Sequence, residues 1–109
     1  MNVFILPEVR QYFYELSYIL YEKDYFSFLD KSEQYVEELI RDIQENLPTK
    51  RHKPALNHFN EYGKNMKYAS FKKNRRTTWY AFFKTYRKDG ETFCLVRYIA
   101  NNHVIAQYL

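Results

Sequence analysis

The sequence has few of the residues that cross-link or break a chain. Its 109 residues include one cysteine, two glycines and three prolines. A single cysteine, Cys94, cannot form an internal disulfide and lacks the partner cysteines of a zinc site, which fits a reducing compartment. The scarcity of glycine and proline, with 46% hydrophobic residues, excludes collagen-like, low-complexity and disordered chains. We therefore expect one globular domain over residues 1–109.

Long hydrophobic runs are also missing. The longest run near the start, residues 3–6, is closed by Pro7. A bilayer-spanning helix takes about 18 apolar residues and a signal-peptide core takes about seven. We therefore expect a cytoplasmic protein that is neither exported nor bound to a membrane.

Carboxylates are scarce in the second part of the chain. Residues 1–47 carry a net charge of −6, whereas residues 48–109 carry +10. The three carboxylates of the basic part, Glu61, Asp89 and Glu91, are scattered, which argues against the acidic cluster of a two-metal nuclease. We expect no metal and no cofactor. Basic charge interleaved with aromatic residues favours a polyanionic partner such as RNA or DNA, and the alternative is a solvated basic face without a ligand.

The first part of the chain predicts a strand and two helices. Residues 3–6 are apolar and partly β-branched, which predicts a strand, and Pro7 is placed to start a helix. Apolar residues then recur at helical spacing as far as Leu20. A second helix is expected to begin at Asp30, with the Asp30 carboxylate as its cap, and to end at Pro48. The acidic part should therefore be a helical hairpin.

The second part predicts an antiparallel sheet. It begins with a basic connection over residues 48–66 and continues with four segments rich in β-branched and aromatic residues. Turn residues at 87–90 join two of these segments. The four segments are 67–71, 78–86, 93–100 and 103–108. The predicted fold class is therefore α+β: an N-terminal strand, a helical hairpin, then a curved antiparallel sheet of three to four strands whose second face is left for function.

Arg97 is a lone cation in an apolar strand. Strand alternation places Arg97 on the same face as Phe93, Leu95 and Ile99. An arginine among apolar residues needs a partner. It is expected either to form an ion pair with a carboxylate of the helices or to hold a phosphate through two parallel hydrogen bonds.

Tyr80 and Lys84 share one face of the preceding strand by the same alternation. Tyr80 is expected either to stack on a base or to pack within the protein. Lys84 would add a cation to the same surface. Both are candidates for RNA contact.

A basic run precedes that strand. Four cations lie within five residues: Lys72, Lys73, Arg75 and Arg76. Such a run is typical of a solvated turn, and it would also suit RNA phosphates or an acidic segment of a partner protein.

His103 is the sharpest candidate for proton transfer, because an imidazole can take or release a proton at cellular pH. The alternative is a structural histidine at a strand end. His52 and His58 lie in the basic connection, where we expect surface or hydrogen-bonding roles.

The chain resembles a known family. The order strand, helix, helix and antiparallel meander is similar to the RelE/ParE superfamily of bacterial type II toxins. The segment RRTTWYAFF at 75–83 looks like a characteristic strand of that family, and LVRYIANNH at 95–103 looks like its final strand, which ends in basic or histidine residues. The likeness covers nearly the whole chain by architecture and about thirty residues by motif.

The resemblance implies either ribosome-dependent cleavage of mRNA or, for the ParE branch, inhibition of DNA gyrase, with a cognate antitoxin that wraps the toxin. A third reading is a non-toxic RNA-binding module. For cleavage, a base must take the 2′-hydroxyl proton, cations must stabilise the phosphate charge, and an acid must protonate the leaving 5′-oxygen. The catalytic candidates are His103, Arg76, Arg97 and Tyr80. The RNA-binding candidates are Lys72, Lys73, Arg75 and Lys84.

The sequence departs from the ribonuclease pattern at one position. Tyr80 stands where the family strand usually carries its phosphate-binding arginine. Either Arg75 or Arg76 would replace that arginine, or Tyr80 would donate a proton, or the chain would lack nuclease activity as in the ParE branch.

Overall fold

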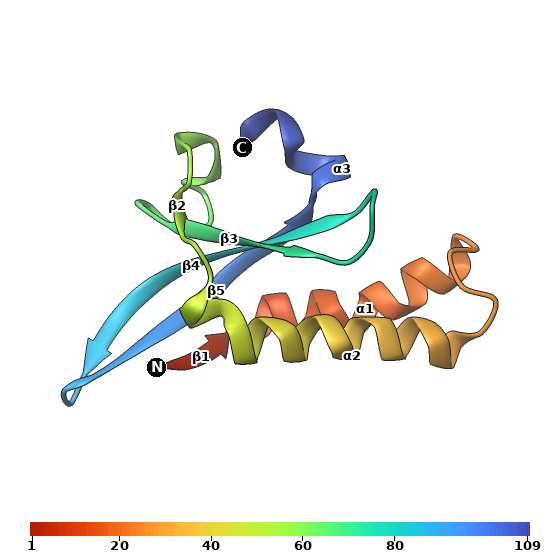
Figure 1. The fold of residues 1–109 in the computed structure, drawn as a ribbon, viewed down its shortest axis with the longest axis horizontal. Coiled ribbons are helices and arrows are strands. Elements are labelled where there is room, and N and C mark those ends of the chain that lie inside the picture. Colours follow the sequence, from red (N-terminus) through yellow and green to blue (C-terminus); the bar gives the residue numbers. More distant parts are fainter.

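Two helices cover one face of a five-stranded sheet in the computed structural model, which describes residues 1–109 (Figure 1). The sheet order is β1-β5-β4-β3-β2, with β1 parallel to β5 and the other neighbours antiparallel. The elements are β1 (Asn2–Ile5), α1 (Pro7–Glu22), α2 (Leu29–Asn46), β2 (Lys53–Pro54), β3 (Lys67–Lys72), β4 (Thr78–Lys88), β5 (Glu91–Asn101) and α3 (Asn102–Ile105). The predicted α+β class is confirmed, with four antiparallel strands and the parallel β1 at the edge.

The helical hairpin forms as predicted, except at the start of α2. The helix begins at Leu29 with Phe28 at the N-cap position, so the predicted capping role of Asp30 is wrong. Asp30 lies in the first turn, where its charge favours the helix dipole. The single proton of the buried Ser32 hydroxyl is shared between Leu29 O at 2.8 Å and Ser17 O at 2.7 Å. The contact with Ser17 O joins α2 to α1.

The main core lies between the helices and the sheet. It combines the apolar stripes of α1 and α2 with every second residue of β3 and β4. Its largest members include Phe13, Leu39, Ile43, Phe71, Trp79 and Phe83. Burying each such side chain contributes roughly 1.5–3 kcal/mol. The indole of Trp79 donates to the Tyr35 hydroxyl at 2.9 Å, which ties the sheet to α2.

A β-bulge changes the faces of β5. Phe82 lies opposite Tyr98 and Phe83 lies opposite Val96, so Arg97 is the extra residue of β5. As a result Ile99 joins Val96 in the main core. The prediction that Arg97 and Ile99 share a face is wrong, because strict alternation fails at a bulge.

The second face of the sheet is partly covered, contrary to the expectation that it would be left open. The connection between β2 and β3 and the C-terminal segment fold over it (Figure 1). They form a second core that comprises Phe59, Met66, Tyr68, Phe82, Ala100 and Ile105. We call this covered side the outer face, since it lies away from the helices.

The predicted last strand, 103–108, is wrong. The chain instead forms α3 and then a 3-10 turn over Ala106–Tyr108. The Asn101 side chain accepts a hydrogen bond from His103 N at 3.0 Å, which caps α3. The helical turn places Ile105 in the second core and lets Tyr108 stack on His58 with ring centroids 3.5 Å apart.

None of the helices has both the length and the apolar character needed to cross a membrane.

Candidate functional site

The loop between β3 and β4 meets the start of α3 at one end of the sheet. Asn102 makes the connection: its Oδ1 accepts from Thr78 N at 2.9 Å and its Nδ2 donates to Arg76 O at 3.0 Å. Thr77 Oγ1 and His103 Nε2 share a hydrogen bond at 3.2 Å, across 26 positions of sequence. The fold thereby brings the backbone at Arg76 to the segment that carries His103.

The backbone of this loop is held in a defined turn. The Asn74 side chain accepts from Arg76 N and from Thr77 N, each at 2.9 Å. Lys73 N donates to Thr77 O at 3.0 Å and closes the turn. The side chains of Arg75 and Arg76 are exposed. A rigid turn therefore presents two guanidinium groups to solvent, which is an arrangement that suits phosphate binding.

The two predicted lysines of the basic run point to opposite faces. Lys73 Nζ lies 5.0 Å from the ring centroid of Tyr35, on the helix side. Lys72 is exposed and pairs with Thr78, and alternation from Tyr68 places it on the outer face. Lys72 therefore joins the side of the sheet that carries Tyr80, whereas Lys73 packs toward α2.

Tyr80 lies on the outer face beside the second core. It pairs with Ala100, and its ring centroid is 5.9 Å from that of Tyr68. Burial raises the pKa of Tyr80, and the neighbouring Tyr68 raises it further. The phenol therefore stays protonated at neutral pH, where it can donate a hydrogen bond or a proton but cannot act as a base.

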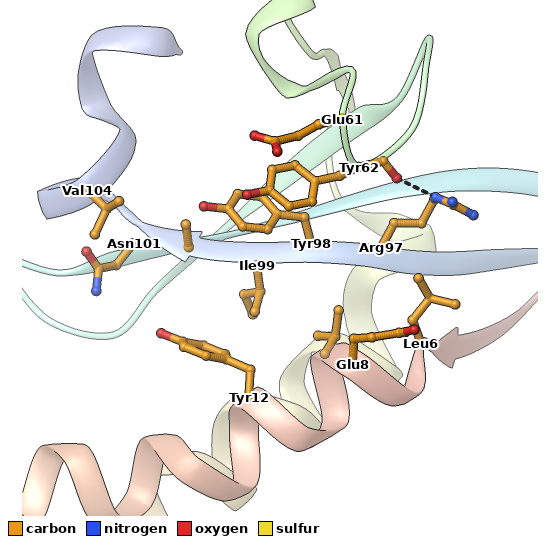
Figure 2. Close-up of a pocket in the computed structure, with 12 residues that line it drawn as sticks. Leu6, Glu8, Tyr12, Glu61, Tyr62, Arg97, Tyr98, Ile99, Asn101 and Val104 are labelled. Atoms are coloured by element: carbon orange, nitrogen blue, oxygen red, sulfur yellow. Dashed lines mark hydrogen bonds between the residues drawn. The ribbon is translucent and has the colours of Figure 1, made fainter.

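Arg97 and Lys84 lie away from the Arg76 and His103 pair. Lys84 is four residues beyond Tyr80 on β4, which is about 13 Å along a strand, and it pairs with Leu95. Arg97 Nε donates to Tyr62 O at 2.6 Å (Figure 2). Arg97 Nη1 donates to Tyr86 Oη at 3.4 Å. Both acceptors are neutral oxygens, so the charge of Arg97 is oriented rather than neutralised.

The predicted residues therefore form two groups. Those at the loop end of the sheet are Lys72, Arg75, Arg76, Tyr80 and His103, which we call the loop-end cluster. Those farther along β4 and β5 are Lys84 and Arg97. Lys73 belongs to neither group.

Sequence reasoning missed the residues that hold the two groups in place. Asn102 and Thr77 fix the loop-end cluster, and Tyr62 with Gly63 fixes Arg97. The Asn101-Asn102 pair was a usable signal, because asparagine is favoured at helix caps and in turns. Nothing in the sequence indicated that the connection would fold back to Arg97.

The other two histidines have the hydrogen-bonding and surface roles expected for them. His52 Nε2 bonds to Leu47 O at 2.8 Å, and its ring packs on Phe83. His58 is exposed and stacks on Tyr108. No three His, Cys, Asp or Glu side chains come together in a group that could hold a metal ion.

Comparisons with known proteins give no match: no family model, no curated protein and no solved structure is significantly similar to this chain. The resemblance to the RelE/ParE superfamily stays a prediction.

Proposed function

We propose that this chain is a RelE-like toxin of a type II toxin-antitoxin system. It acts as a metal-independent endoribonuclease on mRNA within the ribosome, and a cognate antitoxin neutralises it. The observation that carries the proposal is that Asn102 and Thr77 hold the backbone at Arg76 against the segment with His103. Action on ribosomes places the protein in the cytoplasm.

The loop-end cluster supplies each group that the reaction needs. His103 takes the proton of the 2′-hydroxyl, and the 2′-oxygen then attacks phosphorus. Arg76 stabilises the negative charge that develops on the phosphate oxygens. The bond from phosphorus to the 5′-oxygen breaks, and Tyr80 donates the proton that this oxygen takes. The products are a 2′,3′-cyclic phosphate and a 5′-hydroxyl.

The remaining cations would hold the RNA on either side of the reacting phosphate. Lys72 and Arg75 are exposed beside Arg76 and suit the nearest phosphates. Lys84 and Arg97 lie too far along the sheet to touch the same phosphate. We therefore assign Arg97 no part in the chemical step.

A gyrase-binding toxin of the ParE kind is the second candidate, and one observation favours it. Tyr80 packs against the second core, in the strand position where the ribonuclease family carries an arginine. A chain that lacks that arginine could bind gyrase without cleaving RNA.

Mapping 5′ ends on a defined mRNA tests the proposal. The mRNA is incubated with the protein in a reconstituted translation reaction, and the same mRNA is incubated without ribosomes. New ends at codon positions that need ribosomes are expected.

The other outcomes identify the alternatives. Absence of new ends, together with loss of gyrase supercoiling, would support the ParE-like function. Ribosome binding without cleavage and without an effect on gyrase would support a non-toxic RNA-binding module.

A further inference from the structure

One edge of β5 is free over half its length. The strand β1 pairs with residues 93–96 of β5 and then ends, and Leu6 N makes the last bond on that side, to Val96 O. On its other side β5 pairs with β4 as far as Asn101. Residues 97–101 therefore have a strand partner on one side only. Alternate residues of such a segment direct N–H and C=O groups away from the sheet.

A groove runs along this free edge (Figure 2). It has a volume of about 600 Å³, and the five consecutive residues 97–101 line it. Alternate residues of a strand point to opposite faces, so a row of consecutive lining residues means that the strand edge itself borders the groove. Five residues of strand extend for about 16 Å. The groove can therefore accept a short extended chain beside β5.

The walls of the groove are apolar. The lower wall comes from α1 and the turn before it, with Leu6 and Tyr12 (Figure 2). Val9 of α1 also lines the groove. The upper wall includes Tyr62, whose ring stacks on Tyr98 with centroids 3.9 Å apart. An added strand would place its alternate side chains against these two walls, as occurs when a peptide extends a sheet.

Charge distinguishes this groove from the rest of the basic half. Glu8 lies on the lower wall and Glu61 lies on the upper wall (Figure 2). Both residues are exposed. The one cation of the lining, Arg97, is turned to Tyr62 O and Tyr86. Two carboxylates repel RNA and attract basic side chains.

We propose that the groove binds an extended segment of a partner protein, which adds a strand to the free edge of β5. The segment has apolar side chains that face both walls, and basic side chains that face Glu8 on one wall and Glu61 on the other. Main-chain hydrogen bonds to residues 97–101 supply affinity, and the apolar walls supply register. This inference is independent of the proposed ribonuclease, because none of its steps uses cleavage of RNA.

The probe is a blocked octapeptide in which two lysines at each end flank four valines, titrated into the ¹⁵N-labelled protein. Neighbouring residues of a strand point to opposite faces, so each wall meets both valine and lysine. We expect backbone amide shifts centred on residues 97–101 and slower hydrogen exchange at alternate amides of that segment. The same peptide with N-methyl groups on alternate residues cannot form the edge bonds and should bind at least 10-fold more weakly. A valine-glutamate octapeptide should also bind at least 10-fold more weakly.

Two variants test the charge. Glu8→Gln and Glu61→Gln should each weaken binding of the valine-lysine peptide several-fold, whereas Glu45→Gln on the exposed side of α2 should leave the affinity of the peptide unchanged.

Amide shifts that lie elsewhere on the protein, or no shift at millimolar peptide, would overturn the proposal. Equal binding of the N-methylated peptide would show an apolar pocket rather than a strand site. An oligoribonucleotide that shifts the same amides would assign the groove to RNA and overturn the proposal.

Discussion

Arg97 is held by contacts that leave room only for a glycine beside it. Gly63 has a φ of +155°, and a Cβ built there would lie 2.9 Å from Arg97 Nε. This close approach lets Arg97 reach Tyr62 O. The bulge leaves Arg97 on the outer face, where alternation from the buried Cys94 and Val96 already places it, and turns Ile99 into the main core. Neither feature follows from the residues around Arg97, which explains why strand alternation misplaced Ile99.

The Gly63→Ala substitution should lower the free energy of unfolding by roughly 2–3 kcal/mol, from backbone strain and displacement of Arg97. Denaturant unfolding measures the change. Gly90→Ala is the matched control, since Gly90 has a φ of +80° and no neighbour within 4 Å, so only strain of about 1–2 kcal/mol is expected. In wild type, Gly63→Ala should therefore lower the free energy of unfolding more than Gly90→Ala does. In an Arg97→Ala background this excess loss at Gly63 should disappear. An unchanged excess there would refute the steric explanation.

Tyr98 makes stability depend on pH in the alkaline range. Burial raises the pKa of Tyr98 to about 12, and the stacked Tyr62 raises it as well. The unfolded chain loses this proton near pH 10, whereas the native chain keeps it, so the free energy of unfolding falls as pH rises from about 10 to 12. Below pH 10 this contribution is constant.

Tyr98→Phe should make that alkaline decline shallower, which denaturant unfolding at a series of pH values would show. Tyr25→Phe is the control, because Tyr25 is 69% exposed. An identical slope for wild type and Tyr98→Phe would mean that Tyr98 ionises equally in both states.

Asn102 clamps the β3–β4 loop to α3. Asn102→Ala removes the acceptor for Thr78 N and the donor to Arg76 O. We expect mRNA cleavage to fall about 10- to 100-fold, because a displacement near 1 Å of a catalytic group has that effect. Stability should fall by only about 1–2 kcal/mol. Asn46→Ala, which removes an exposed bond to Asp42 on α2, should leave cleavage unchanged. Equal activity in both variants would contradict a role for the clamp.

The sequence predicted best the elements that local pattern determines. Helical periodicity located α1 and α2, and β-branched and aromatic residues located β3, β4 and β5. The failure at 103–108 has a physical cause: the capping bond from Asn101 and the burial of Ile105 override local strand propensity. The approach of the Arg76 backbone to the segment with His103 depends on the β4–β5 register, which the sequence does not reveal.

Charge is divided across the whole molecule between acidic helices and a basic sheet. The acidic part carries −6 and the basic part +10. If exposed cations of the loop-end cluster contact phosphates, the binding constant for a single-stranded oligoribonucleotide must fall as the salt concentration rises. In a plot of log binding constant against log salt concentration, each phosphate contact adds about 0.7 to the steepness of the slope. Lys72→Ala and Arg75→Ala should each reduce the slope by about that amount in an anisotropy titration. Lys31→Ala on α2 should leave it unchanged, and a smaller slope in that variant would place the RNA elsewhere.

The loop-end cluster is the proposed site of the chemistry, and the initial rate of cleavage of ribosome-bound mRNA is the measurement that depends on it. Arg76→Ala and His103→Ala should each lower the rate about 100-fold or more, with ribosome binding retained. The double variant should fall little further, because both residues act on one step. His58→Ala, at an exposed histidine outside the cluster, should cleave at the wild-type rate. Wild-type cleavage by both single variants would contradict the assignment of this cluster as the site of the chemistry.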